Sequence, residues 1–464
     1  MRERDHAGVT VVAAASSAEK PLRTRRTALA LGFGGLVAFA LFFLVRPFLG
    51  PLAPYGPRPA GTTYAYSWLV VAAFVPYAAA VWATRHGVAP TVALVGIAVL
   101  HGLLVPAPLT QSQDLYMYLF YGKMWAVHGA NPYVAIPAAF ALDPWFPWVR
   151  WPNQPTVYGP IWTLLTSIPA RLSPDSLMTA FFLAKAMVLA FGLACVAGVV
   201  AACRARGLDP GAGLVLGAWN PVILIALPLG GHADVAVVAA LLWAVVADAR
   251  DRPLLTAALL AGGALVKPYA GIALVVYLVA LARRGRGLLP ATAVAGGLAV
   301  ASFAPFWAGW DTFQGMAEIA GRASSSLTGE IQRVLEGMVG AAPAAWTVRA
   351  IGLAVVAWIV VAGARRSGFA EDPWPTASAA FLAYVLVAPW FLYWHQAGPL
   401  ALAAVAASPT VRASAYTFSA TSMVTASFAG TPLGRAVQAA LRYGPPLGLL
   451  WRRPGQGRAS RRRP

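Results

Sequence analysis

The feature that most constrains the fold of this chain is its succession of long apolar runs, which are separated by short turns that contain arginine. Hydrophobic residues make up 59% of the 464 residues, charged residues only 11%, and the mean hydropathy is +0.65. A soluble domain needs more polar surface than this composition supplies, so lipid is the expected solvent for most of the chain. The sequence therefore predicts an all-α polytopic membrane protein.

The apolar runs can be read as membrane spans, because a helix that crosses the hydrocarbon core needs about 20 apolar residues. Several runs are shorter than that, so we expect a range of about 12–14 transmembrane helices. The candidate spans are residues 27–48, 64–83, 91–108, 177–202, 212–229, 235–247, 254–266, 271–282, 288–306, 348–364, 377–392, 399–407, 416–429 and 437–450.

The basic residues indicate the orientation of these spans. They give a formal net charge of +19, but they gather in short turns between apolar runs, which is the positive-inside pattern of a membrane protein and not a nucleic-acid-binding face. The pattern predicts a basic leader (1–26) and a basic tail (452–464) in the cytoplasm, on either side of a transmembrane domain (27–451). Residues 110–158 and 230–234 then fall outside, as expected of a multi-pass protein of the plasma membrane.

One outer segment, at 111–133, has the sequence QSQDLYMYLFYGKMWAVHGANPY. On a helix that starts at Asp114, four rings fall within about 40° of that residue and form one stripe. GANPY ends the helix, because proline cannot continue it. We predict a helix along the outer membrane surface with the acid at its N-terminal end; the alternative is that the rings anchor the interface and the acid caps the helix. The four rings are those of Tyr118, Tyr121, Trp125 and His128.

The rest of this outer segment is rich in tryptophan, proline and tyrosine, as in LDPWFPWVRWPNQPTVYGPIW at 142–162. Loops longer than about 12–15 residues are usually functional or disordered, and disordered segments contain few aromatic residues. We therefore expect this segment to be folded over something. Tyr133, Tyr158 and Trp162 are the rings that we single out in it, although each is also typical of interface anchoring.

Further outer positions carry polar side chains beside apolar runs. Arg150 and Lys267 are charges beside apolar runs, which are usually retained for a function; the alternative is that each extends a charged end to the interface from apolar surroundings. His395, in PWFLYWHQ, lies beside aromatic residues at another outer position. His232 and Asp234, in GGHAD, precede an expected helix, where Asp234 can also act as an N-cap.

The remaining signals exclude several classes of site. Cys195 and Cys203 lie in one apolar run, which is not the pattern of a disulfide framework or a zinc site. The sequence contains no HExxH, Walker A or dinucleotide-binding glycine motif. The charged stretch RASSSLTGEIQR, at 322–333, is typical of a solvated loop. No internal repeat is evident, which weighs against a two-fold transporter.

Five stretches follow one another in the order SQDLYMYLFYGKMWAVHGANPY, PTVYGPIWTLL, GAWNPVILIALPLGGHAD, ALVKPYAGIAL and PWFLYWHQAGPL. In this order and spacing they resemble the polyprenol-phosphate-mannose-dependent alpha-(1→6)-mannosyltransferases of actinobacterial envelopes, which belong to the GT-C superfamily. The resemblance extends over most of the chain, from about residue 27 to 450. It implies the GT-C fold, with an outer catalytic loop at 110–158 after the third span.

The resemblance also implies a reaction: mannose moves from polyprenyl-phosphate-mannose, a lipid-linked donor, to a lipid-anchored alpha-(1→6)-mannan of the lipomannan type, with inversion. Asp114 matches the acidic residue that acts as general base on the acceptor hydroxyl. Phosphate is a good leaving group and needs no acid, whereas a glycosidase needs two carboxyl groups. The candidates for the donor phosphate are Arg150, Lys267, His232 and His395, and those for the acceptor sugar are Tyr118, Tyr121, Trp125, Tyr133, Tyr158 and Asp234.

A departure from the superfamily bears on the expected cofactors. Many GT-C relatives carry adjacent acids or an Asp-x-Asp pattern, but Asp114 is flanked by Gln113 and Leu115, and Asp143 is the only other acid between residues 110 and 158. Magnesium normally binds one or two carboxylates together with phosphate oxygens. We therefore expect no metal site and no cofactor besides the lipid-linked donor.

Two alternative functions stay open at this point. The same fold suits another polyprenyl-phosphate sugar, such as arabinofuranose or glucose. A multipass transporter or lipid flippase is the alternative from a different class, and it predicts ionisable residues buried in the middle of spans.

Overall fold

The computed structural model describes residues 5–50, 53–57, 66–324, 326–424 and 431–451, with side chains from residue 23 onward. Within these ranges the chain is helical, and the β pairing is limited to an isolated bridge between Ala308 and Trp310. The expected basic tail at 452–464 lies outside the described residues, as do the first four residues of the leader and the end of the expected span 416–429.

Many helices of the first half of the chain begin in the same way. Proline stands at the first position of α3, α5, α7, α8 and α10, where its missing N–H would have had no intrahelical partner. The Asp209 side chain caps α7 and that of Asn220 caps α8. The helices are α1 (Asp5–Val45), α2 (Ser67–Ala83), α3 (Pro90–Leu104), α4 (Asp114–Ala126), α5 (Pro160–Leu172), α6 (Leu177–Ala205), α7 (Pro210–Ala218), α8 (Pro221–Leu224), α9 (Asp234–Asp248) and α10 (Pro253–Val266).

The second half of the chain continues with α11 (Gly271–Arg284), α12 (Leu288–Phe303), α13 (Gln314–Gly321), α14 (Leu327–Val339), α15 (Ala341–Ala364), α16 (Trp374–Val387), α17 (Ala397–Val405), α18 (Pro409–Thr421) and α19 (Pro432–Trp451). One π-helix, η5 (Ile225–Leu229), directly follows α8. The 3₁₀ turns are η1 (Arg46–Leu49), η2 (Thr84–His86), η3 (Pro137–Phe140), η4 (Phe146–Trp148), η6 (Pro268–Ala270), η7 (Ala304–Phe306), η8 (Asp311–Phe313) and η9 (Tyr393–Gln396).

The described residues contain five helices that are long and apolar enough to cross a membrane, at Arg23–Leu49, Ser67–His86, Leu177–Ala205, Leu288–Phe306 and Ala341–Ala364. The pair Pro210–Ala218 and Pro221–Leu229, bent by 62°, brings the number to six if it is one span. Three shorter apolar helices are α3, α10 and α16. The all-α polytopic class is confirmed, whereas the range of 12 to 14 spans exceeds these numbers because several apolar runs form short or broken helices.

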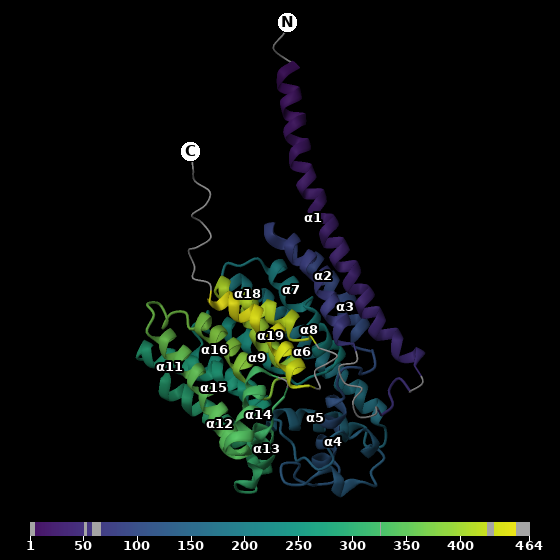
Figure 1. The fold of residues 1–464 in the computed structure, drawn as a ribbon, viewed down its shortest axis with the longest axis vertical. Coiled ribbons are helices and arrows are strands. Elements are labelled where there is room, and N and C mark those ends of the chain that lie inside the picture. The colour runs from purple at the N-terminus through teal and green to yellow at the C-terminus, as the bar shows by residue number, and fades with distance from the viewer. Residues whose placement is uncertain (1–4, 51–52, 58–65, 325, 425–430, 452–464) are drawn as a thin grey trace.

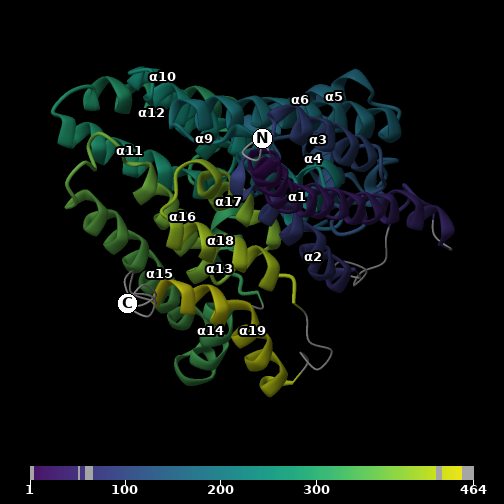
Figure 2. The ribbon, with the colours of Figure 1, turned by 90° about the horizontal axis from the view of Figure 1, so that it is seen from above.

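The helices form a bundle whose middle is made by α9 and α17, in which nearly every residue is buried. Figure 2 shows α17 near the centre, with α10 to α12 on one side and α1 to α3 on the other. The start of α1 and the helices α4 and α5 lie at opposite ends of the long axis (Figure 1). The expected apolar segments coincide with helices, but α5, α13 and α14 were not expected.

Candidate active site

The outer segment that follows α3 is folded around α4, as expected, but not as a helix on a surface. Residues Leu115 to Met124 of α4 are all buried, so the predicted position along a surface is wrong: the helix is covered on every face. The Trp148 indole, in η4, donates a hydrogen bond to the backbone oxygen of Tyr55, 3.0 Å away. The aromatic residues of this segment therefore pack around α4 and against the rest of the protein.

A close backbone contact joins this segment to the end of α10. Gly159 N–H donates to the backbone oxygen of Val266 at 3.0 Å, and a Cβ at position 159 would lie 1.9 Å from the oxygen of Leu265. Only glycine permits this approach. The contact brings Tyr158 beside Lys267, whose ammonium lies 5.8 Å from the centre of the Tyr158 ring.

A second close contact positions the turn between η5 and α9. The Lys185 ammonium, fully buried, donates to the backbone oxygens of Pro228 at 2.8 Å and Leu229 at 2.6 Å and so holds the end of η5. Gly231 has a φ of +65°, and a Cβ there would meet the Leu115 side chain at 3.0 Å. The turn thus lies directly against the start of α4.

These contacts bring His232 to Asp114. Asp114 Oδ2 lies 3.6 Å from His232 Nδ1, and the Tyr118 hydroxyl lies 3.4 Å from the same nitrogen. The Asp114 side chain is 15% exposed, whereas the His232 side chain is fully buried. The His232 ring stacks on Trp394, with 3.9 Å between the ring centres, and this fixes its plane.

The surroundings act on both groups electrostatically. Burial raises the pKa of Asp114, and neighbouring hydroxyls and the charge of Lys267 oppose this rise. Burial, followed by the charge of Lys267, lowers the pKa of His232 well below its ordinary value, so the ring is neutral near pH 7. Among the described residues no lysine or arginine lies within ion-pair distance of Asp114, which is therefore a carboxylate of raised basicity.

The second acid, Asp234, has a different environment. It is the first residue of α9, and its side chain does not cap the helix. Instead Lys267 Nζ lies 2.5 Å from Oδ2, and the Tyr269 hydroxyl donates to Oδ1. The ring of His395 lies 5.8 Å from that of Tyr269, centre to centre. The structure thus joins three of the predicted residues, Asp234, Lys267 and His395, through Tyr269.

The predicted aromatic residues are divided between the site and the interior. Tyr118 packs edge-on against Tyr158, with 4.6 Å between ring centres, next to Asp114. Tyr121 donates to the backbone oxygen of Gln154 at 2.8 Å. Tyr133 is fully buried and its hydroxyl donates to the backbone oxygen of Tyr158, so it supports the site from behind. The other two are Trp125, against Phe306, and Trp162, fully buried against Tyr118.

Two other polar residues of the outer segment have separate environments. Arg150 is half-buried, and within the described part of the chain its guanidinium has no hydrogen-bond partner. Asp143 is paired with Lys123, at 2.8 Å, and with His128, also at 2.8 Å. Burial opposes ionisation of Asp143, but hydrogen bonds led by that of Lys123 hold its pKa below the ordinary value. Asp143 therefore stabilises the loop.

The stretch at 322–333 is not the solvated loop that its composition suggested. Arg322 Nη2 donates to Oε1 of Gln154, 2.5 Å away, and the Ser324 hydroxyl donates to the backbone oxygen of Pro389, 3.2 Å away. The stretch thus joins the first outer segment to the loop that carries His395.

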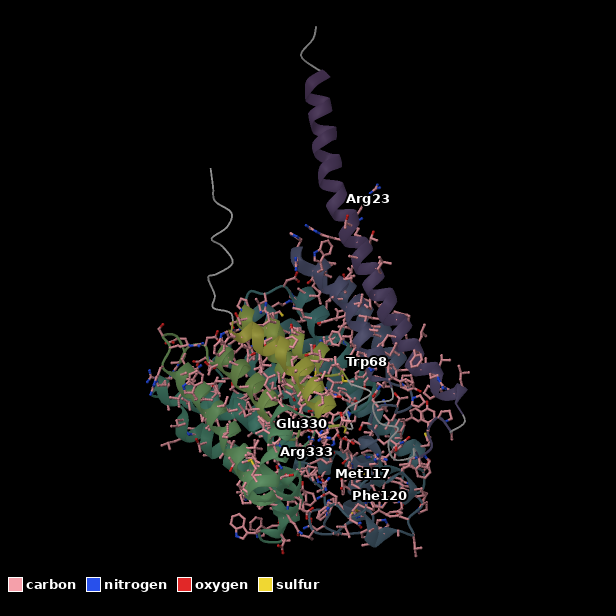
Figure 3. The ribbon with its side chains drawn as sticks, viewed as in Figure 1. Arg23, Trp68, Met117, Phe120, Glu330 and Arg333 are labelled. Carbon is pink, nitrogen blue, oxygen red and sulfur yellow. The ribbon has the colours of Figure 1, made fainter. Side chains whose placement is uncertain are left out.

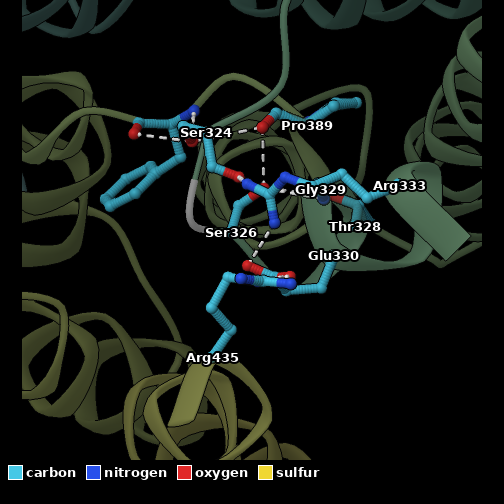
Figure 4. A network of polar contacts seen from close by, with 9 residues as sticks. Ser324, Ser326, Thr328, Gly329, Glu330, Arg333, Pro389 and Arg435 are labelled. Carbon is cyan, nitrogen blue, oxygen red and sulfur yellow. Dashed lines mark hydrogen bonds and ion pairs between the residues drawn. The ribbon is translucent and has the colours of Figure 1, made fainter. Parts of the chain in front are cut away.

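A charged network completes this connection. Arg333 and Arg435 both contact the Glu330 carboxylate, the latter at 3.1 Å, and Arg333 Nη2 donates to the Ser324 backbone oxygen at 2.8 Å (Figure 4). Figure 3 places Glu330 and Arg333 toward the same end of the molecule as Met117 of α4, and Arg23 toward the other end.

Sequence reasoning missed several residues that shape the site. Lys185 gave a signal, because it is a charge within an apolar run, but its carbonyl acceptors belong to a π-helix that no sequence pattern indicates. Tyr269 and Trp394 stand beside Lys267 and His395 in the quoted motifs. Gln154 gave no signal of its own.

Within the described residues no group of three or more histidine, cysteine, aspartate or glutamate side chains gathers as a metal site would require. The bundle places an acid without a cationic partner among the described residues at the start of a buried helix, beside aromatic rings. The all-helical polytopic fold is consistent with that of a GT-C type glycosyltransferase.

The comparisons with known proteins identify the family. The model of the alpha-(1→6)-mannopyranosyltransferase N-terminal domain matches residues 28–283, more than half of the chain, and the model of glycosyltransferase family 87 matches residues 156–428. The chain belongs to the alpha-(1→6)-mannopyranosyltransferase family and is a multi-pass membrane mannosyltransferase. No curated protein and no solved structure matches the chain. The alternative of a transporter or flippase is not supported.

Proposed function

We propose that this enzyme transfers mannose from polyprenyl-phosphate-mannose to a lipid-anchored alpha-(1→6)-mannan acceptor at the outer face of the plasma membrane. One observation carries the assignment of the base: Asp114 is desolvated, slightly exposed, and close to a neutral imidazole instead of a cation. The carboxylates elsewhere in the bundle that are paired with arginine or lysine are poor bases by comparison, because a nearby positive charge favours their ionised form.

In the proposed reaction the acceptor hydroxyl attacks the anomeric carbon of mannose while its proton passes to the Asp114 carboxylate. The bond between the anomeric carbon and the phosphate oxygen breaks, and the electron pair leaves with polyprenyl phosphate. Attack from the face opposite the phosphate inverts the anomeric centre, so a beta-linked donor gives an alpha-mannoside. His232 lies beside the carboxylate and positions it, and Tyr118 contacts the same imidazole nitrogen.

We assign the phosphate and sugar roles from the exposure of the side chains and from the residues beside them. Arg150 and His395 have side chains that are partly exposed, and we assign them, with Lys267, to the donor phosphate. Lys267 shares its charge with Asp234 and contributes its remaining N–H groups. Tyr158, partly exposed beside Tyr118, is the ring we assign to the sugar.

We propose that transfer does not depend on a divalent metal. Asp114 has a histidine and a tyrosine as its near neighbours, and the second acid is already neutralised by Lys267. A magnesium ion bound to the donor phosphate would have Asp114 as its one unpaired carboxylate ligand here, and in the proposed reaction that carboxylate accepts the proton instead.

The outer location is supported by the distribution of basic residues along the molecule. Arg23, at the start of the first apolar run, lies toward the end of the long axis opposite α4 (Figure 3). Because arginine-rich turns remain in the cytoplasm, the site around Asp114 then faces outward.

The test is a transfer assay with purified enzyme, labelled polyprenyl-phosphate-mannose and an alpha-mannoside acceptor, with the linkage of the product read by NMR. We expect an alpha-(1→6) product and a loss of about 10²–10⁴-fold for Asp114→Ala, the usual contribution of a general base. Asp175→Asn, at an exposed acid between α5 and α6, is the matched control and should transfer normally. Full activity of a folded Asp114→Ala variant would refute the assignment of the base.

The same assay decides the donor sugar. Polyprenyl-phosphate-arabinofuranose and polyprenyl-phosphate-glucose should be poor donors, because a site built to bind sugar hydroxyls discriminates against sugars that place them differently. Equal rates with either of these donors would replace mannose in the proposal and leave the role of Asp114 intact.

A further inference from the structure

Arg349 is a charged residue inside a membrane span. It lies eight residues after the start of α15, or about 12 Å along the helix axis. α15 is one of the five helices long and apolar enough to cross a membrane. A cation at such a depth is costly and is usually retained for a function.

The guanidinium of Arg349 has an unoccupied edge. Nε and Nη2 are both buried, and neither has a hydrogen-bond partner among the described residues. These two nitrogens form one side of the planar group, the side that binds two oxygens of a phosphate or carboxylate at once. Because arginine stays protonated, an anion with two oxygens is the partner that best satisfies both N–H groups and the charge.

The surrounding protein does not supply that anion. Nη2 lies 3.6 Å from the position of a Cβ on Gly321, the last residue of α13, so the group is tucked against the end of that helix. The three acids on the neighbouring short helices have other partners: Glu318 accepts from Gln154, Glu330 contacts Arg333 and Arg435, and Glu336 accepts from Gln332. The Trp346 ring, 5.4 Å away, covers one face of the guanidinium.

The exposed surface of α15 beside Arg349 indicates where the anion comes from. Trp346 is 69% exposed, Leu353 69% and Trp358 70%, which identifies a surface in contact with acyl chains. An anion that reaches Arg349 from this side must carry an apolar tail. A lipid phosphate has this chemistry, and a free ion does not.

The position also connects to the active site. Gly321, which contacts Arg349, is followed by Arg322, and Arg322 binds the Gln154 side chain. The backbone oxygen of Gln154 accepts the Tyr121 hydroxyl, on the helix that Asp114 begins. A lipid phosphate at Arg349 therefore has a second arginine between itself and α4.

We propose that Arg349 is a docking site for the phosphate of the polyprenyl carrier at the bilayer-facing side of α13 and α15, separate from the transfer site. The proposal rests on the proposed function for the identity of the lipid. The carrier is favoured over bulk phospholipid because the arginines lead from the bilayer surface toward Asp114.

The test is binding of radiolabelled polyprenyl phosphate, without a sugar, to the full chain in nanodiscs. We expect Arg349→Gln to weaken binding by about 10- to 100-fold, as for the loss of hydrogen bonds to a charged group. Arg349→Lys keeps the charge but not the two-nitrogen edge. Its affinity for polyprenyl phosphate should lie between that of the unaltered enzyme and that of Arg349→Gln. Arg365→Gln removes an exposed charge at the other end of α15 and should bind as the unaltered enzyme does.

Competitors identify the source of the phosphate. Excess phosphatidylglycerol or inorganic phosphate should not displace the labelled lipid. Displacement by phosphatidylglycerol at equal concentration, displacement by inorganic phosphate, or unchanged affinity in Arg349→Lys would each overturn the proposal. If Arg349→Gln does not fold, the affinity of Arg349→Lys for polyprenyl phosphate tests the proposal.

The assay contains no sugar, so its result is independent of the transfer assay. If mannose transfer fails while binding of polyprenyl phosphate still depends on Arg349, the proposed reaction is wrong and the docking site stands. If mannose transfer succeeds and binding of polyprenyl phosphate does not depend on Arg349, only the proposed docking site is wrong.

Discussion

The carboxylates at two regions of this molecule have opposite environments. At the ends of α9 and α11, Asp248 accepts from Arg284 at 2.9 and 3.4 Å and from the Trp374 indole at 2.8 Å. At the start of α4, Asp114 faces a neutral histidine across 3.6 Å and has no arginine or lysine within ion-pair distance in the described chain. The first arrangement joins two helices, and the second leaves an acid without a cationic partner. In the proposed function this difference separates structural acids from the base.

The largest expected effect comes from exchanging these two acids for asparagine. Asp248→Asn leaves the Arg284 guanidinium without its carboxylate, and breaking a buried pair in this way costs about 3–5 kcal/mol. We expect a clear fall in melting temperature, with the transfer rate per folded enzyme retained. Thermal melting in nanodiscs and the mannose transfer assay measure the two quantities.

Asp114→Asn should behave in the reverse way. Burial raises the pKa of Asp114, so the folded state binds this proton more readily than the unfolded state, and above the unfolded pKa the ionised group lowers stability. We expect a higher melting temperature at neutral pH together with the loss of transfer. If both variants lower stability and leave transfer unchanged, the distinction between the two regions is wrong.

A smaller effect is expected from Lys185→Met, which tests how the reactive region is held in place. Methionine fills a similar volume but cannot donate to the backbone oxygens of Pro228 and Leu229. The turn that carries His232 then loses its anchor, and we expect kcat to fall about 10-fold, the effect of displacing a catalytic group slightly. Substrate KM should change little, since Lys185 is buried behind the turn. A change in KM alone would show that Lys185 acts on binding.

The fold was largely predictable from the sequence, because hydropathy marks the segments that became the long apolar helices, although α5 was not expected. The number of complete spans was not, since the bend between α7 and α8 and the brevity of α3, α10 and α16 depend on packing. The helices α13 and α14 escaped prediction because they are short and partly charged, and their connections to Gln154 and Pro389 span more than 60 residues of sequence.

The residues proposed for the site were identified from sequence motifs, whereas the contacts between them could not be predicted. Asp114, His232, Asp234, Lys267 and His395 were all singled out from motifs. Which acid is paired could not be read from the sequence, because Asp234 and Lys267 are 33 residues apart and meet only through the packing of α9 on α10. That pairing is what separates a neutralised acid from a base.

The finest test of this separation is the position of the acidic limb in the pH profile of transfer. Lys267 lowers the pKa of Asp114 and Asp234 raises it, as opposite charges must. Lys267→Met removes the positive charge, so the pKa of Asp114 rises further, and activity should be lost at a higher pH as the medium is acidified. Asp234→Asn removes the negative charge and leaves Lys267, so the limb should move to lower pH.

Both variants weaken the pair equally as a structural contact, so only an electrostatic action on Asp114 predicts shifts of opposite sign. The measurement is kcat/KM for mannose transfer across the acid range, which reports the free enzyme, with each profile scaled to its own maximum. Asp175→Asn, at an exposed acid, serves as the control and should leave the limb where it is. Shifts in the same direction in the two variants would mean that Asp114 is not the group that titrates, and that a different acid sets the limb.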